Sequence, residues 1–109
     1  MTMLVAALLF LQPDAPGPPE VWYRQALDCG ASLAATAEPG AKPKGEAAEK
    51  MLLWGFIVAD AAPRAGRTAE QVDGPDSQAA LAYFREIKAR KPEAHKAHLA
   101  YCRALTRKP

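Results

Sequence analysis

The chain has 109 residues, of which 50% are hydrophobic, and a formal net charge of +2 at pH 7. This length supplies a core for one domain and excludes a multidomain protein. The apolar residues are Ala and Leu far more often than the β-branched and aromatic residues that strands prefer, so the composition predicts helices. The small net charge excludes neither nucleic acid nor anionic lipid by itself.

The first apolar stretch is MLVAALLFL at residues 3–11, and the Pro-rich segment QPDAPGPPE follows it at once. The stretch is too short to span a bilayer, but it has the length of the apolar region of a secretory signal. We therefore expect residues 1–17 to be a signal peptide or a disordered N-terminal segment, and residues 18–109 to form the helical domain. The alternative is a first apolar helix at residues 3–11 that packs on the others.

A first helix is expected to begin after Pro18-Pro19 and to run to about Ala37, where Glu38-Pro39-Gly40 stops it. Glu20 lies in its first turn, where a negative charge complements the helix dipole. One face of this helix is predicted to point inward, and it consists of Trp22, Ala26, Cys29, Leu33 and Ala37.

A second helix is expected from about Glu46 to Ala61. It contains MLLWGFIVA at residues 51–59, a stretch without charge on any side. Because a helix that is apolar all round is normally surrounded by other helices, this one is predicted to be the central element. Gly55 is expected to allow the close approach of another backbone.

The sequence TAEQ that begins at Thr68 has the spacing of a capping box and predicts a short helical turn, which residues 73–75 should break. A third helix should then start near Asp76 or Ser77, either of which could cap it. Pro92 and Glu93 should open a fourth. The third helix is predicted to have one stripe that consists of Ala80, Phe84, Ile87 and Lys91, with Leu81 beside it. In the fourth helix the shared face is predicted to consist of Ala94, His98, Tyr101, Cys102 and Leu105. We also expect the aromatic residues Trp22, Tyr23, Trp54, Tyr83 and Phe84 to pack in the core.

Cys29 and Cys102 are the only two cysteines, one near each end of the expected domain, and both lie on inward stripes. This pattern predicts one long-range disulfide, which the chain-entropy model values at roughly 4 kcal/mol. The alternative is a zinc site formed by these cysteines with His95 and His98, or a cysteine nucleophile beside His98. We expect the disulfide, and therefore no metal, no cofactor and no catalytic residue. The predicted fold is an all-α bundle of three to four helices closed by this bond.

From Arg85 onward the chain contains eight Lys or Arg residues and only two Glu residues. Such a cluster is either a solvated basic face or a site for an anionic partner. Asp60 is the one acid that the apolar second helix is expected to carry close to its core. It is expected to reach solvent or to pair with Arg64, with a catalytic carboxylate as the alternative.

The segment WGFIVADA at residues 54–61, KPEAH at residues 91–95 and the closing Cys102 together resemble the Tai-type immunity proteins, which neutralise type VI secretion amidases. The early Trp22 near Cys29 and the pair Val72-Asp73 resemble the HdeA-type acid-activated chaperones. Both groups are small periplasmic helical proteins with bridged cysteines. The resemblance therefore implies a helical protein that functions by binding other proteins.

These observations together predict an exported, non-catalytic helical protein, periplasmic or secreted, that binds another protein and not a nucleic acid. We expect no stable membrane span after processing. The binding surface is predicted at residues 39–46 and 63–76 and on the basic face of the last two helices. Two alternatives stay open, namely a metal-binding protein or enzyme that uses the Cys/His set, and an envelope protein with a purely structural role.

Overall fold

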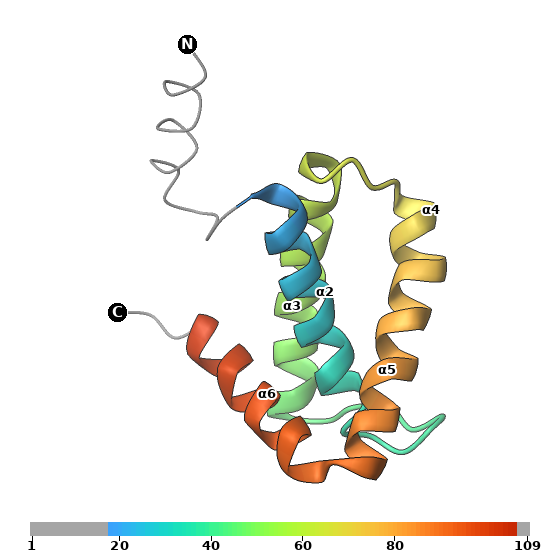
Figure 1. Ribbon diagram of the computed structural model, residues 1–109, viewed down its shortest axis with the longest axis vertical. Helices are drawn as coiled ribbons and strands as arrows, with labels where there is room; N and C mark the ends of the chain where they lie inside the picture. Colours follow the sequence, from blue (N-terminus) through green and yellow to red (C-terminus); the bar gives the residue numbers. More distant parts are fainter. Residues whose placement is uncertain (1–17, 107–109) are drawn as a thin grey trace.

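The computed structural model describes residues 18–106, and in this range it contains helices and no strands. Its elements in chain order are α2 (Pro19–Ala34), α3 (Glu46–Arg64), α4 (Ala69–Gln71), the π-helical turn η1 (Val72–Asp76), α5 (Ser77–Arg90) and α6 (Pro92–Leu105). Helix α2 packs against α3, α5 and α6 (Figure 1). The predicted all-α bundle closed by a disulfide is confirmed.

The central element is α2, so the prediction that the second helix is central was wrong. Helix α3 packs on α2 along one side only, where Trp54 and Val58 are buried. On its other side Leu52 and Phe56 are 64% and 67% exposed. The sequence of α3 is apolar on every side of the helix. In the described part of the chain, however, other helices cover only one of those sides.

Gly55 does not allow a close approach of another backbone, because a Cβ atom built there would meet nothing within 4 Å. The close approach of α2 and α3 lies at Gly30 instead. A Cβ atom at Gly30 would lie 3.7 Å from the Cβ atom of Trp54. A small residue on the central helix therefore lets the largest side chain of α3 pack against it.

The hydrophobic core lies along α2 and takes one face from each of its neighbours. Its most buried members are Tyr23, Ala26, Leu27, Cys29, Ala35, Trp54, Ala61, Ala62, Ala80, Phe84 and Cys102. The prediction that the aromatic residues are in the core holds for Tyr23, Trp54 and Phe84. Trp22 is only half-buried, with its ring 6.3 Å from that of Trp54. Tyr83 is 60% exposed, so its placement in the core was wrong.

Several helix boundaries agree with the local signals. Helix α6 begins at Pro92, whose missing N–H costs nothing in a first turn. Helix α2 ends at Ala34, a few residues before the expected end. Helix α3 continues through Pro63 to Arg64 before Gly66, at φ 73°, ends the helical segment. Pro63 lacks the amide hydrogen that would bond to the Ala59 carbonyl oxygen, but only Arg64 follows it in α3, so the loss is confined to the end of the helix.

The predicted capping box is confirmed. The Thr68 hydroxyl accepts from the Gln71 amide at 3.2 Å, and the Gln71 side chain accepts from the Thr68 amide at 2.9 Å. The predicted break at residues 73–75 was wrong, because η1 carries the helix through to α5. The wider π-helical turn accommodates Pro75, which has no amide hydrogen to donate. Neither Asp76 nor Ser77 caps α5 with its side chain.

None of the helices within residues 18–106 has the length and apolar character required for crossing a membrane. The apolar stretch at residues 3–11, which we predict to be a secretory signal, lies outside the described residues.

Candidate functional site

The disulfide joins the central helix to the last one. Cys29 of α2 and Cys102 of α6 are bonded with their Cα atoms 5.6 Å apart, and their side chains are 0% and 2% exposed. Both cysteines face the core, as their helical stripes predict. The bond therefore fixes the position of α6 on α2 from inside the bundle.

The proposed Cys/His set is assembled only in part. Ligand atoms of Cys29, His98 and Cys102 lie within 4.8 Å of one another, and His98 Nδ1 is 3.7 Å from the Cys102 sulfur. His95 is not part of this group, because its Nε2 donates to the Ser32 carbonyl oxygen at 2.9 Å. The bonded sulfurs offer no thiolate to a metal ion or a substrate, so the oxidised protein has neither a Cys₂His site nor a cysteine nucleophile.

His98 packs beside the disulfide as an aromatic side chain. Its ring stacks on Phe84, with the ring centroids 4.5 Å apart and the planes 25° apart. Burial lowers the pKa of His98 below 6.5, and the neighbouring His95 lowers it further. His98 therefore remains neutral at neutral pH and links α6 to α5.

A buried polar network joins three segments of the chain. The hydroxyl of Tyr23 donates to Asp76 Oδ2 at 2.7 Å, while Arg67 Nε and Nη2 donate to Asp76 Oδ2 and Oδ1 at 2.9 and 2.8 Å. The pKa of Asp76 lies below 3.8, mainly because Arg67 donates two hydrogen bonds to its carboxylate and secondly because the Tyr23 hydroxyl donates another. Burial, followed by the hydrogen bond to Asp76, raises the pKa of Tyr23 to about 12. This network secures η1 against α2.

Asp60 reaches solvent and pairs with Arg64, as expected from the sequence. Its carboxylate is 3.6 Å from Arg64, and both side chains are mostly exposed. The basic residues of the last two helices are also largely solvated, and two of them pair with neighbouring acids, Arg90 with Glu86 and Lys96 with Glu93. In the described part of the chain, this region therefore remains a solvated basic surface, with six Lys or Arg residues and two Glu residues.

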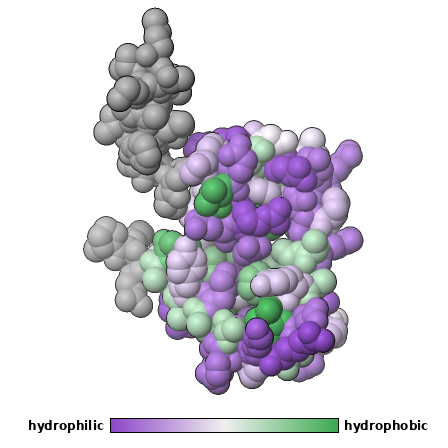
Figure 2. All heavy atoms as spheres, in the orientation of Figure 1, coloured by the Kyte–Doolittle hydropathy of each residue, from purple (hydrophilic) through white to green (hydrophobic). Residues whose placement is uncertain are grey.

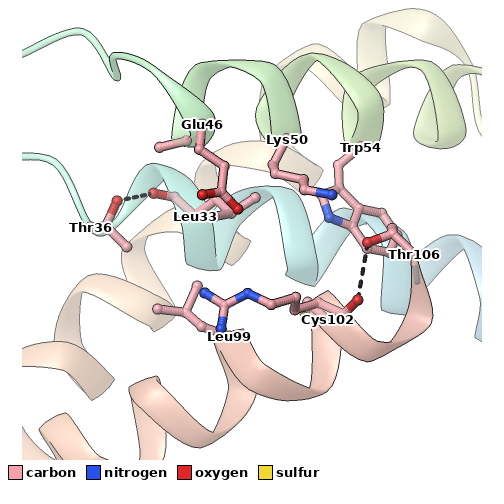
Figure 3. Close-up of a pocket in the computed structure, with 10 residues that line it drawn as sticks. Leu33, Thr36, Glu46, Lys50, Trp54, Leu99, Cys102 and Thr106 are labelled. Atoms are coloured by element: carbon pink, nitrogen blue, oxygen red, sulfur yellow. Dashed lines mark hydrogen bonds between the residues drawn. The ribbon is translucent and has the colours of Figure 1, made fainter. Parts of the chain in front are cut away.

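A cavity of about 250 Å³ lies between α3 and α6, with the C-terminal end of α2 at its base (Figure 3). We call it the α3–α6 cavity. Its apolar walls include Leu33, Trp54 and Leu99, and Cys102 also lines it, so the disulfide lies at its edge. Its complete lining is Leu33, Thr36, Glu46, Ala47, Lys50, Trp54, Leu99, Cys102, Arg103 and Thr106. This cavity could not be predicted from the sequence, because its lining comes from α2, α3 and α6 and from Thr36 and Thr106 just beyond α2 and α6.

Helix α3 also carries an exposed apolar face, which consists of Leu52, Leu53 and Phe56 and which we call the α3 outer face. These side chains are 64%, 38% and 67% exposed, and they lie within adjacent turns. Figure 2 shows one side of the molecule, on which strongly hydrophobic side chains form small separate spots among hydrophilic ones. Within residues 18–106, α3 has the most exposed large hydrophobic residues of any helix, since Val21, Tyr83 and Tyr101 each lie on a different one.

Comparison of the sequence with protein-family models and with curated proteins, and of the structure with solved structures, finds no match.

Proposed function

We propose that this protein is an exported, non-catalytic helical protein that functions by binding another protein. The Cys29–Cys102 bond supports the compartment, because disulfides form and persist in oxidising environments and are rare where thiols are kept reduced. The apolar stretch at residues 3–11 supports it independently, through its length and the Pro-rich segment that follows. The periplasm and the outside of the cell both meet these conditions.

The observation that carries the binding function is the exposure of the α3 outer face. Leu52 and Phe56 lie one turn apart and present most of their side-chain surface to solvent. Contiguous exposed apolar side chains on a small protein mark an interaction site, because burying them in a complex releases ordered water at little conformational cost. This surface differs from the predicted one, which comprises residues 39–46, residues 63–76 and the basic face of the last two helices.

The chemistry of the face defines the partner. The outer face is a convex stripe on one helix, so the complementary surface is an apolar groove that receives α3. Glu49 is exposed at one end of the stripe, while Asp60 at the other end pairs with Arg64. We therefore propose a protein partner with an apolar groove that has a Lys or Arg side chain beside Glu49.

The exposure of this face also favours binding by the folded protein, as in immunity proteins, over binding by a partly unfolded chaperone. An acid-activated chaperone of the HdeA type must unfold in part before it exposes its binding surface. Here Leu52 and Phe56 are exposed in the folded bundle, so a partner can bind without any loosening of the fold. The Tai-type resemblance of residues 54–61 implies the same mode, in which one folded partner is bound and inhibited.

Site-specific cross-linking tests this proposal. A photoreactive phenylalanine analogue is placed at Phe56, and at Tyr83 as a matched control, because Tyr83 is an exposed aromatic residue on a different helix. We expect one cross-linked partner at Phe56 and none at Tyr83. With that partner purified, Phe56→Ser should weaken binding by about thirtyfold, the loss typical of a central apolar anchor, and Tyr83→Ser should leave it unchanged.

Two results would contradict the proposal. In the first, the Phe56→Ser and Tyr83→Ser variants bind the partner equally well, which would place the interface elsewhere. In the second, the protein binds nothing at neutral pH but protects unrelated proteins from aggregation in acid, in proportion to its concentration. That second result would replace the single-partner function with a chaperone function.

A further inference from the structure

Two cavities flank the buried indole of Trp54, and they differ in charge. The α3–α6 cavity lies on one side. On the other lies a cavity of about 320 Å³ between α3 and the η1–α5 segment, which we call the α3–α5 cavity. Its lining consists of Leu27, Gly30, Ala31, Ala34, Met51, Trp54, Gly55, Val58, Ala59, Val72, Asp73, Ser77 and Leu81. Both cavities are largely apolar, so shape and hydrophobicity alone do not distinguish their ligands.

The charged residues do distinguish them. The α3–α6 cavity is lined by two cationic side chains, Lys50 and Arg103, and one carboxylate, Glu46. The α3–α5 cavity has Asp73 as its one charged lining residue. No ion pair among the described residues includes Lys50 or Arg103. Figure 3 shows Lys50 and Glu46 pointing from α3 into the space above α6. The first cavity therefore combines an apolar interior with cations from two opposing helices.

We propose that the α3–α6 cavity binds a small molecule with an apolar body and a single carboxylate, such as a medium-chain fatty acid. Leu33, Trp54 and Leu99 would enclose the hydrocarbon. Arg103 and Lys50 would bind the carboxylate by charge-assisted hydrogen bonds, which are stronger than bonds between neutral groups. This site lies apart from the α3 outer face, so the proposal does not depend on the partner protein.

The volume sets the size of the ligand. A water molecule occupies about 30 Å³ in the liquid, so about 250 Å³ holds roughly eight groups of that size. This is the size of the chain of octanoate, with the carboxylate at the rim between the two cations. A longer chain would extend into solvent and gain little from the walls.

Titration with octanoate, followed by amide ¹H–¹⁵N spectra of the oxidised protein, tests the proposal. We expect shifts at Ala47, Leu99 and Thr106, which line the α3–α6 cavity, and none at Val72 or Leu81, which line the other cavity. Octan-1-ol and octylammonium are the matched ligands, with the same chain and a neutral or positive head. Both should bind the α3–α6 cavity more weakly than octanoate by about tenfold or more.

Variants of the cationic pair complete the test. Lys50→Gln with Arg103→Gln should weaken octanoate binding by about tenfold or more. Arg85→Gln with Lys96→Gln removes the same charge outside the cavity and should leave binding unchanged. Glu46→Gln should strengthen binding, because it removes the one carboxylate at the rim. Three results would each overturn the proposal: no octanoate binding, equal binding of octan-1-ol, or equal effects of the two double variants.

Discussion

Removal of the disulfide should cost this domain much of its stability. Cys29 and Cys102 are separated by 73 residues, and the chain-entropy model gives about 4.4 kcal/mol at 25 °C for closing a loop of this length in the unfolded chain. Domains of this size are stable by about 5–15 kcal/mol in total. In urea denaturation followed by circular dichroism, the Cys29→Ala, Cys102→Ala double variant should therefore lose at least about 4 kcal/mol of unfolding free energy.

The reduced wild-type protein is the control, because it lacks the covalent bond but keeps both sulfur atoms in place. It should lose about the same 4.4 kcal/mol, and its denaturant dependence should steepen, since an uncrosslinked chain exposes more surface on unfolding. A loss below about 1 kcal/mol in both proteins would refute the reasoning. It would mean that the bond contributes little to the unfolding free energy, and that packing holds α6 on α2 without it.

The remaining predictions concern the Tyr23–Asp76–Arg67 network. Tyr23→Phe should lower the unfolding free energy by about 1 kcal/mol, because it removes one buried hydrogen bond, and urea denaturation measures this. Ultraviolet absorbance of the phenolates should show that Tyr23 ionises at about pH 12. Because the pKa of Asp76 is lowered by folding, its ionised form stabilises the protein above pH 3.8, and this contribution disappears as the pH falls through the folded-state pKa. The stability difference between wild type and Asp76→Asn should therefore be largest near neutral pH and narrow in acid. A difference that stays constant down to pH 2 would contradict this role.

The parts of the fold that local rules govern could be predicted from the sequence. The Thr68 capping box, the start of α6 at Pro92 and the pairing of two inward-facing cysteines each depend on a few neighbouring residues or on there being only two cysteines. The break at residues 73–75 was a local prediction that failed. Gly-Pro punctuation usually ends a helix, and here the π-helical turn continues it.

Apart from the disulfide, the long-range contacts could not be predicted. A helical stripe indicates that a residue faces inward, but it does not identify the residue that it meets. Of the two histidines on α6, His95 is the more deeply buried one and bonds to a backbone carbonyl of α2, although His98 lies on the predicted stripe. The local pattern predicts Asp76 or Ser77 as a helix cap, whereas the partners of Asp76 are Tyr23 and Arg67 from other segments.

Intact mass spectrometry with a thiol-alkylating reagent, under denaturing conditions without reductant, tests the oxidised, exported state most directly. For the natively expressed protein we predict no alkylation, together with a mass that lacks the residues before the helical domain. Two alkylated thiols on a chain that retains residues 1–17 would contradict both the disulfide and the export. That result would leave Cys29, His98 and Cys102 free to bind zinc, within 4.8 Å of one another.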